Sequence, residues 1–215
     1  MAPLVFVDTN VFKFTATSLP RYVARQQRIQ WGPLAIDVTV HDDTVVNPNE
    51  RIQNAELKTE ADLLFPLAEL GKAGTVRYIW TVESLCELWG LPNLDSQTEA
   101  FYGAPVAMAD APFYYQRAVG GIGIDSTAER MRFLLSINSK RFFELQKATG
   151  AYQGELPPNK NQMLDAFHMW CAEHNRCDYF LTLDFSLIRV LGRSPLRTSV
   201  RVVKPSELLR ELSGS

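Results

Sequence analysis

The sequence is poor in the residues that most often reveal a site directly. Its 215 residues include three cysteines and three histidines. Cys86, Cys171 and Cys177 lack the spacing typical of a zinc site. An odd number of cysteines also gives no disulfide framework, so we expect reduced thiols, as in cytosolic proteins. The cysteine pattern therefore favours neither a structural zinc site nor a disulfide-stapled secreted fold.

Long apolar runs and a strong net charge are missing as well. No apolar stretch approaches the ~18 residues that a membrane-spanning helix needs. Met1-Ala2-Pro3 leads directly into a short apolar segment, so we expect no secretory signal, no membrane association and a cytoplasmic location. The net charge of −2 and the pI near 6.0 do not indicate a nucleic-acid binder, although a local basic rim is compatible with both.

The composition is that of an ordinary globular domain. Hydrophobic residues make up 46% of the chain and charged residues 21%, which is enough to build a full core at this length. Strand-like and helix-like segments alternate, and this order is typical of a parallel sheet with crossover helices. We therefore predict one α/β domain over residues 1–215, a three-layer α/β/α sandwich with a central, mainly parallel sheet.

Hydrophobic periodicity, caps and breakers place the individual elements. Strands are predicted over 4–7, 76–80, 178–183 and 200–203. Helices are predicted over 12–28, 56–70, 82–89, 128–149, 161–175, 185–191 and 205–212. Thr81 is the expected N-cap of the helix that starts at residue 82.

Two segments do not fit the alternation of strands and helices, and we predict that they are insertions. Over 29–50, alternation of Ile36, Val38 and Val40 with polar residues predicts a β-hairpin that projects from the body with a polar exposed face. The segment 91–155 begins with a loop rich in proline and aromatic residues and continues into a helical insertion. Its glycine run at 120–123 lacks a strand-then-helix context, which argues against phosphate binding.

Two strand ends carry acidic residues. The apolar run 4–7 leads straight into Asp8, and the run 179–183 leads into Asp184. A strand buried on both faces reads as such a continuous apolar run. Its carboxyl end lies where open α/β sheets place their ligands. Two neighbouring strands of this kind would bring both carboxylates to one edge.

Two further acids can reach the same edge, Glu87 from the helix over 82–89 and Asp165 from the helix over 161–175. Clustered carboxylates need a cation or raised pKa values, and hard oxygen ligands suit Mg²⁺ or Mn²⁺. This pattern favours metal-assisted phosphodiester hydrolysis. The alternatives stay open: either strand-end Asp as a helix cap, Asp165 as a helix-dipole partner, and Glu87 as a solvated residue with Glu83 competing for its place.

These residues resemble the PIN-domain ribonucleases, the fold of many toxins of toxin-antitoxin pairs. The resemblance covers about 4–12, 55–90 and 160–212. The matching motifs are Val7-Asp8-Thr9-Asn10-Val11, Thr81 with Glu87-Leu88, Asp165-Ala166-Phe167-His168, the run from Asp178 to Asp184, and Val203-Lys204-Pro205-Ser206-Glu207-Leu208-Leu209.

The resemblance implies a Mg²⁺ or Mn²⁺ site that cleaves RNA. By position, the metal ligands would be Asp8, Glu87, Asp165 and Asp184, directly or through water. Asn10 and Thr182 would orient carboxylates or a water by hydrogen bonds. It also implies an RNA substrate, and admits an antitoxin-like protein partner and a homodimer. The chain departs from the pattern at Ser186, where an acid often follows, and in its two insertions.

Basic and aromatic residues supply candidate RNA contacts. Arg21, Arg25 and Arg28 would share one face of the predicted helix over 12–28, and Lys160 precedes Asp165. Such a basic rim would hold an RNA backbone, whereas the alternative is a solvated helix face. The run 113–115, Phe-Tyr-Tyr, either stacks on unpaired bases or belongs to the core or an interface. His168 either borders the acidic cleft or is a packed helix residue.

The sequence thus supports two hypotheses of different classes. The first is a metal-dependent endoribonuclease that uses the acidic cluster. The second is a non-catalytic RNA- or protein-binding module that keeps the PIN fold, which the two insertions motivate. Loss of activity in Asp8→Asn would mark the first, and binding insensitive to that change would mark the second.

Overall fold

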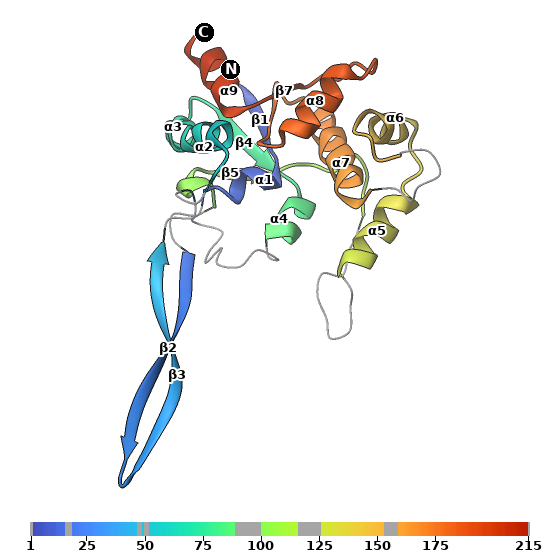
Figure 1. Cartoon of the computed structure of the whole chain (residues 1–215). Coiled ribbons are helices and arrows are strands. Elements are labelled where there is room, and N and C mark those ends of the chain that lie inside the picture. The colour runs from blue at the N-terminus through green and yellow to red at the C-terminus, as the bar shows by residue number, and fades with distance from the viewer. Residues whose placement is uncertain are drawn as a thin grey trace.

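A central sheet of five parallel strands organises the chain (Figure 1). This computed structural model describes residues 2–15, 19–46, 49, 52–88, 100–115, 126–152 and 159–214. The strand order is β5-β4-β1-β6-β7. The strands are β1 Leu4–Val7, β4 Arg77–Trp80, β5 Val106–Met108, β6 Tyr179–Leu181 and β7 Arg201–Val203.

Helices cover both faces of this sheet. The described helices are α1 Thr9–Phe12, α2 Ala55–Asp62, α3 Leu64–Lys72, α4 Val82–Leu88, α5 Ser126–Ser136, α6 Lys140–Ala148, α7 Lys160–His174, α8 Phe185–Arg193 and α9 Pro205–Ser213. A short 3₁₀ helix, η2, spans Ala100–Gly103.

The core consists of two clusters, because alternate strand residues point to opposite faces. Val5 and Val7 of β1 pack with α3 and α9, whereas Phe6 between them packs with α5, α6 and α7. The Phe6 ring stacks on Phe180 of the neighbouring strand at a centroid distance of 5.2 Å. The predicted three-layer α/β/α sandwich with a parallel sheet is confirmed.

Two long predicted helices are each divided into two. The segment predicted over 56–70 breaks at Leu63 between α2 and α3, because Pro66 has no N–H to donate to the carbonyl of Asp62. The segment predicted over 128–149 is divided at residues 137–139. There the side chain of Ser139 caps α6 by accepting a hydrogen bond from the Phe142 N–H at 3.4 Å.

The helix predicted over 12–28 is wrong. Helix α1 ends at Phe12, and residues 19–31 form a strand, β2 (Leu19–Trp31), paired antiparallel with β3 (Leu34–Val46). The predicted hairpin exists, but it begins at residue 19 rather than 29 and turns at Gly32-Pro33. Gly32 has a φ of +57°, which a two-residue hairpin turn requires at its first central position.

The hairpin projects from the body, as predicted (Figure 1). Its exposed surface, however, is not polar throughout. One face of the ribbon carries Ile29, Trp31, Leu34 and Ile36, with Trp31 76% exposed. The opposite face carries polar residues such as Gln26, Arg28 and Asp37. The hairpin is therefore amphipathic, and its apolar face is open to solvent.

The contact between α3 and β4 gives a stability prediction. A Cβ atom on Gly71 of α3 would lie 2.6 Å from Cε2 of Tyr78, whose ring is buried and whose hydroxyl donates to the Leu67 carbonyl at 2.7 Å. Gly71→Ala is expected to lower the free energy of unfolding by ~1–3 kcal/mol through overpacking.

The matched control is Gly192→Ala in α8, where an added Cβ meets no described atom within 4 Å. Because alanine is the better helix former, this change should raise stability by up to ~1 kcal/mol. Guanidinium denaturation of both variants measures the difference. Equal stability of Gly71→Ala and wild type would contradict the packing of α3 on Tyr78.

Two further observations concern the class of protein. Among the described helices, none is long and apolar enough to cross a membrane. No disulfide joins the three cysteines, all of which lie in described segments, and Cys171 and Cys177 are buried. The thiols are therefore reduced in this structure, as expected.

Candidate functional site

The ends of β1 and β6 bring the first two predicted acids to one edge of the sheet. In the parallel register Val7 lies opposite Leu181, and the Asp8 N–H donates to the Leu181 carbonyl at 3.0 Å. Asp8 is thus placed beside Thr182, with Asp184 two residues further on. This is the carboxyl edge of the strands, where open α/β sheets hold their ligands.

The side chain of Asp8 is held by a hydrogen-bond network centred on Thr182. The Thr182 hydroxyl donates to Oδ2 of Asp8 at 2.7 Å, and it accepts from the Asn10 amide and the Asp184 N–H, each at 3.0 Å. Oδ1 of Asn10 accepts from the Leu183 N–H at 3.0 Å. Thr182 is fully buried and Asp8 is 4% exposed, so the network fixes the orientation of a buried carboxylate.

Asp184 caps α8. Its Oδ1 accepts from the N–H groups of Ser186 at 2.8 Å and Leu187 at 3.0 Å. The capping alternative considered from the sequence is therefore real for this residue. The cap uses one oxygen, and no hydrogen bond within the described segments engages Oδ2. Capping thus fixes the carboxylate while leaving its second oxygen at the sheet edge.

The pKa of Asp165 is shifted by its surroundings. It lies in the second turn of α7. Burial raises its pKa to about 9, and the charges of Asp8, Asp184 and Glu87 act in the same direction, while Lys13 opposes them. The charges of the other three predicted acids therefore act on Asp165, and together with burial they favour its protonated form.

Glu87 and its competitor Glu83 meet a cation that sequence reasoning missed. Both acids lie on α4, and both face Arg130 of α5. Nη1 of Arg130 is 3.4 Å from Oε1 of Glu87, and Nε is 3.6 Å from Oε2 of Glu83. Glu83 is fully buried, whereas the Glu87 side chain is 26% exposed. Arg130 comes from the insertion over 91–155 and lies more than forty positions from Glu83 and Glu87 in sequence, so no local motif predicts this contact.

Arg130 should therefore contribute strongly to stability. Arg130→Met is expected to lower the free energy of unfolding by ~3 kcal/mol, because it leaves the buried carboxylate of Glu83 without its cation. Arg132→Met is the control, since that side chain is 72% exposed and pairs with Glu129 one turn away. The control should change stability by less than ~0.5 kcal/mol. Equal denaturation midpoints for the two variants would refute this role of Arg130.

His168 is both a packed residue and a neighbour of Asp8. Its ring is buried against Phe6 at a centroid distance of 5.6 Å. Nδ1 lies 3.9 Å from Oδ1 of Asp8, and Nε2 lies 3.4 Å from Oγ of Ser84. The Ser84 N–H in turn donates to Oγ1 of Thr81 at 3.1 Å, which confirms the predicted N-cap. This chain of contacts joins the end of β4 to the acids.

The predicted arginine face does not exist. Arg25 and Arg28 lie on a strand, three residues apart, and therefore point to opposite faces of the ribbon. Nε of Arg28 is 4.0 Å from Asp37 across the hairpin. The Arg21 side chain lies outside the described residues. Lys160 begins α7, the helix that carries Asp165, so it stays a candidate RNA contact.

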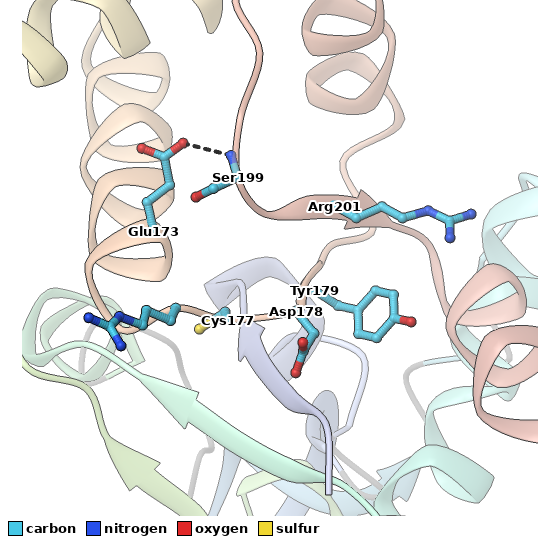
Figure 2. Close-up of a pocket in the computed structure, with 7 residues that line it drawn as sticks. Glu173, Cys177, Asp178, Tyr179, Ser199 and Arg201 are labelled. Atoms are coloured by element: carbon cyan, nitrogen blue, oxygen red, sulfur yellow. Dashed lines mark hydrogen bonds between the residues drawn. The ribbon is translucent and has the colours of Figure 1, made fainter. Parts of the chain in front are cut away.

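A pocket of about 400 Å³ lies at the opposite edge of the sheet (Figure 2). It is lined by residues at the end of α7 and at the starts of β6 and β7, and its acids bond to groups of the chain itself. Glu173 accepts from the Ser199 N–H at 3.1 Å and pairs with Arg141, and Asp178 accepts from the Leu4 N–H at 2.8 Å. These bonds link α7 to the segment before β7, and β1 to the segment before β6. The acids of this pocket therefore stabilise the fold, and the acidic edge described above is the better candidate for the functional site.

The donor set at the carboxyl edge fits a hard divalent cation. Four acidic side chains act on one another there, and burial, with the charges of Asp8, Asp184 and Glu87, raises the pKa of Asp165. A bound Mg²⁺ or Mn²⁺ would compensate these negative charges. Within the described segments no three His, Cys, Asp or Glu side chains stand close enough together to hold a metal ion.

Comparisons with known proteins do not identify the chain. It matches no family model, no curated protein and no solved structure. The resemblance to PIN-domain ribonucleases rests on the sequence motifs quoted above. The functional argument must therefore come from the site itself.

Proposed function

We propose that the chain is a metal-dependent endoribonuclease of the PIN-domain type. One observation carries the proposal: adjacent parallel strands bring Asp8 and Asp184 to the same edge of the sheet, where the Thr182 hydroxyl donates to Asp8 and accepts from the Asp184 N–H. An acidic cluster of this kind, at the carboxyl edge of a parallel sheet, is a costly arrangement that a functional cation would justify.

The residues would divide the work as follows. Asp8, Glu87, Asp165 and Asp184 would hold Mg²⁺ or Mn²⁺, with Asp165 releasing its proton on binding. Thr182 and Asn10 keep Asp8 in a fixed orientation, and the cap on α8 does the same for Asp184. When bound, the metal would supply Lewis-acid activation of water and neutralise the charge that develops on the phosphate.

The rival proposal is a non-catalytic binding module that keeps the fold. Arg130 favours it, because an internal cation already faces Glu83 and Glu87 and partly compensates their charge. In that case the four acids would be held by protonation and by Arg130 rather than by a metal. Such a protein would bind RNA or a protein partner through other surfaces.

A cleavage assay separates the two proposals. Labelled single-stranded RNA is incubated with the protein and Mn²⁺, with Mg²⁺, or with EDTA. The nuclease proposal requires fragments with either metal and none with EDTA. RNA that is bound but stays intact in all three conditions would favour the binding module.

A further inference from the structure

A second pocket, of about 540 Å³, opens on the same side of the sheet as the acids. Its lining includes Thr81, which follows β4, and Asp110, which follows β5. The lining also includes the aromatic side chains of Phe113, Tyr114, Tyr115 and His174. The pocket therefore combines aromatic rings with hydrogen-bonding groups, and its volume suits a small planar ligand.

A series of side-chain contacts connects the pocket to the acidic site. Phe6 of β1 lies opposite Ile79 of β4 in the parallel register, so Asp8 and Thr81 leave adjacent strands at the same level. Ser84 bonds both Thr81 and His168, and His168 lies 3.9 Å from Asp8. Thr81 of the pocket is thus linked to Asp8 through Ser84 and His168.

The aromatic run at 113–115 divides into two roles. The rings of Phe113 and Tyr115 pack inward, Phe113 on Trp170 at 5.7 Å and Tyr115 on Phe133 at 4.7 Å between centroids. Tyr114 lies between them in sequence, and its side chain is 85% exposed at the pocket. Packed neighbours on both sides hold the backbone of a large, solvent-facing ring.

Asp110 is positioned by its backbone. Its N–H donates to Oδ1 of Asn175 at 3.0 Å, and its carbonyl accepts from the Asn175 amide at 2.7 Å. These two hydrogen bonds to Asn175, the residue after α7, hold the Asp110 backbone, and Asp110 is exposed and lines the pocket. Guanine presents two adjacent N–H donors on its Watson–Crick edge, which a carboxylate can accept together.

We propose that this pocket binds an unpaired guanine base of RNA, which stacks on Tyr114 and donates to Asp110. The inference rests on the proposed function, because it takes single-stranded RNA to be the substrate of the acidic site. Aromatic stacking supplies affinity for any base. The Asp110 carboxylate supplies the preference for guanine, since adenine and uracil lack the pair of adjacent donors.

The test is fluorescence anisotropy with two labelled nine-residue RNAs in EDTA, one of uridines only and one with a single central guanine. Wild type should bind the guanine RNA about 10-fold tighter. Tyr114→Ala should lose about 10-fold in affinity for both RNAs, and Tyr114→Phe should restore it. Asp110→Asn should remove the guanine preference alone. Trp31→Ala, an exposed aromatic on the hairpin, is the matched control and should bind as wild type.

Three results would contradict the proposed guanine site: equal binding of both RNAs by wild type, no binding of either RNA, or no effect of Tyr114→Ala. Cleavage is scored separately in Mn²⁺. Guanine-selective binding that depends on Tyr114, without cleavage, would support the guanine site and contradict the proposed nuclease function. Metal-dependent cleavage by a protein that fails the binding test would support the nuclease function and contradict the guanine site.

Discussion

Asp8→Asn is expected to reduce metal-dependent RNA cleavage by about 10³-fold or more while leaving the fold intact. The change replaces a carboxylate of the cluster by a neutral amide, and so removes one of the proposed metal ligands. In the wild type the Thr182 hydroxyl donates to Oδ2 of Asp8 at 2.7 Å. The amide oxygen of asparagine can accept the same hydrogen bond, so the network should persist. Losses of this size accompany removal of groups that stabilise developing charge.

The matched control is Asp37→Asn on the hairpin, which removes the same charge from a side chain that is 68% exposed and remote from the sheet edge. It should cleave RNA at the wild-type rate. Initial rates on one labelled RNA, measured at saturating Mn²⁺, compare the three proteins. Cleavage by Asp8→Asn within ten-fold of wild type would remove Asp8 from the catalytic site.

The stability of the metal-free protein is expected to fall as pH rises from about 5 to 9. The folded pKa of Asp165 is about 9, well above the unfolded value of ~3.9. Between these values the folded state holds a proton that the unfolded state has released, so the free energy of unfolding declines with pH. The contribution is complete below ~pH 4 and is lost as pH passes 9. Because Asp165 keeps partial contact with solvent, we expect a decline of ~2 kcal/mol.

Asp165→Asn supplies the decisive comparison. A neutral amide cannot ionise, so this variant should lose the decline and be the more stable protein at pH 8 without metal. It should also lose most of the stabilisation that Mn²⁺ gives wild type at that pH. Asp62→Asn, a surface change on α2, should behave as wild type in both respects. Chemical denaturation at pH 5, 7 and 8.5 measures the effect, and parallel pH profiles for wild type and Asp165→Asn would contradict it.

The sheet and its acids were predictable because the signals are local. A continuous apolar run ending in an acid describes β1 and β6 closely, and the order of strands and helices excludes most other folds. The helix of Asp165 was placed within one residue at each end, since its Asn159 cap and apolar spacing lie within one segment. Such features need no knowledge of distant parts of the chain.

The errors arose where tertiary pairing decides. Arg21, Arg25 and Arg28 have helical spacing, but thirteen cross-strand pairs place them in a hairpin. Strand β5 is three residues long and has a partly exposed edge, so its sequence carries little strand signal. Arg130 reaches the acids only because α5 packs against α7. Each of these features depends on residues far away in sequence.

Manganese binding by calorimetry is the most direct test of the metal site. Wild type is titrated at pH 7.5 beside the double variant Asp8→Asn/Asp184→Asn, with folding of both verified by circular dichroism. We expect saturable binding with proton release in wild type and none in the double variant. A folded wild-type protein that takes up no Mn²⁺, or a double variant that binds as tightly as wild type, would show that these carboxylates do not form a metal site.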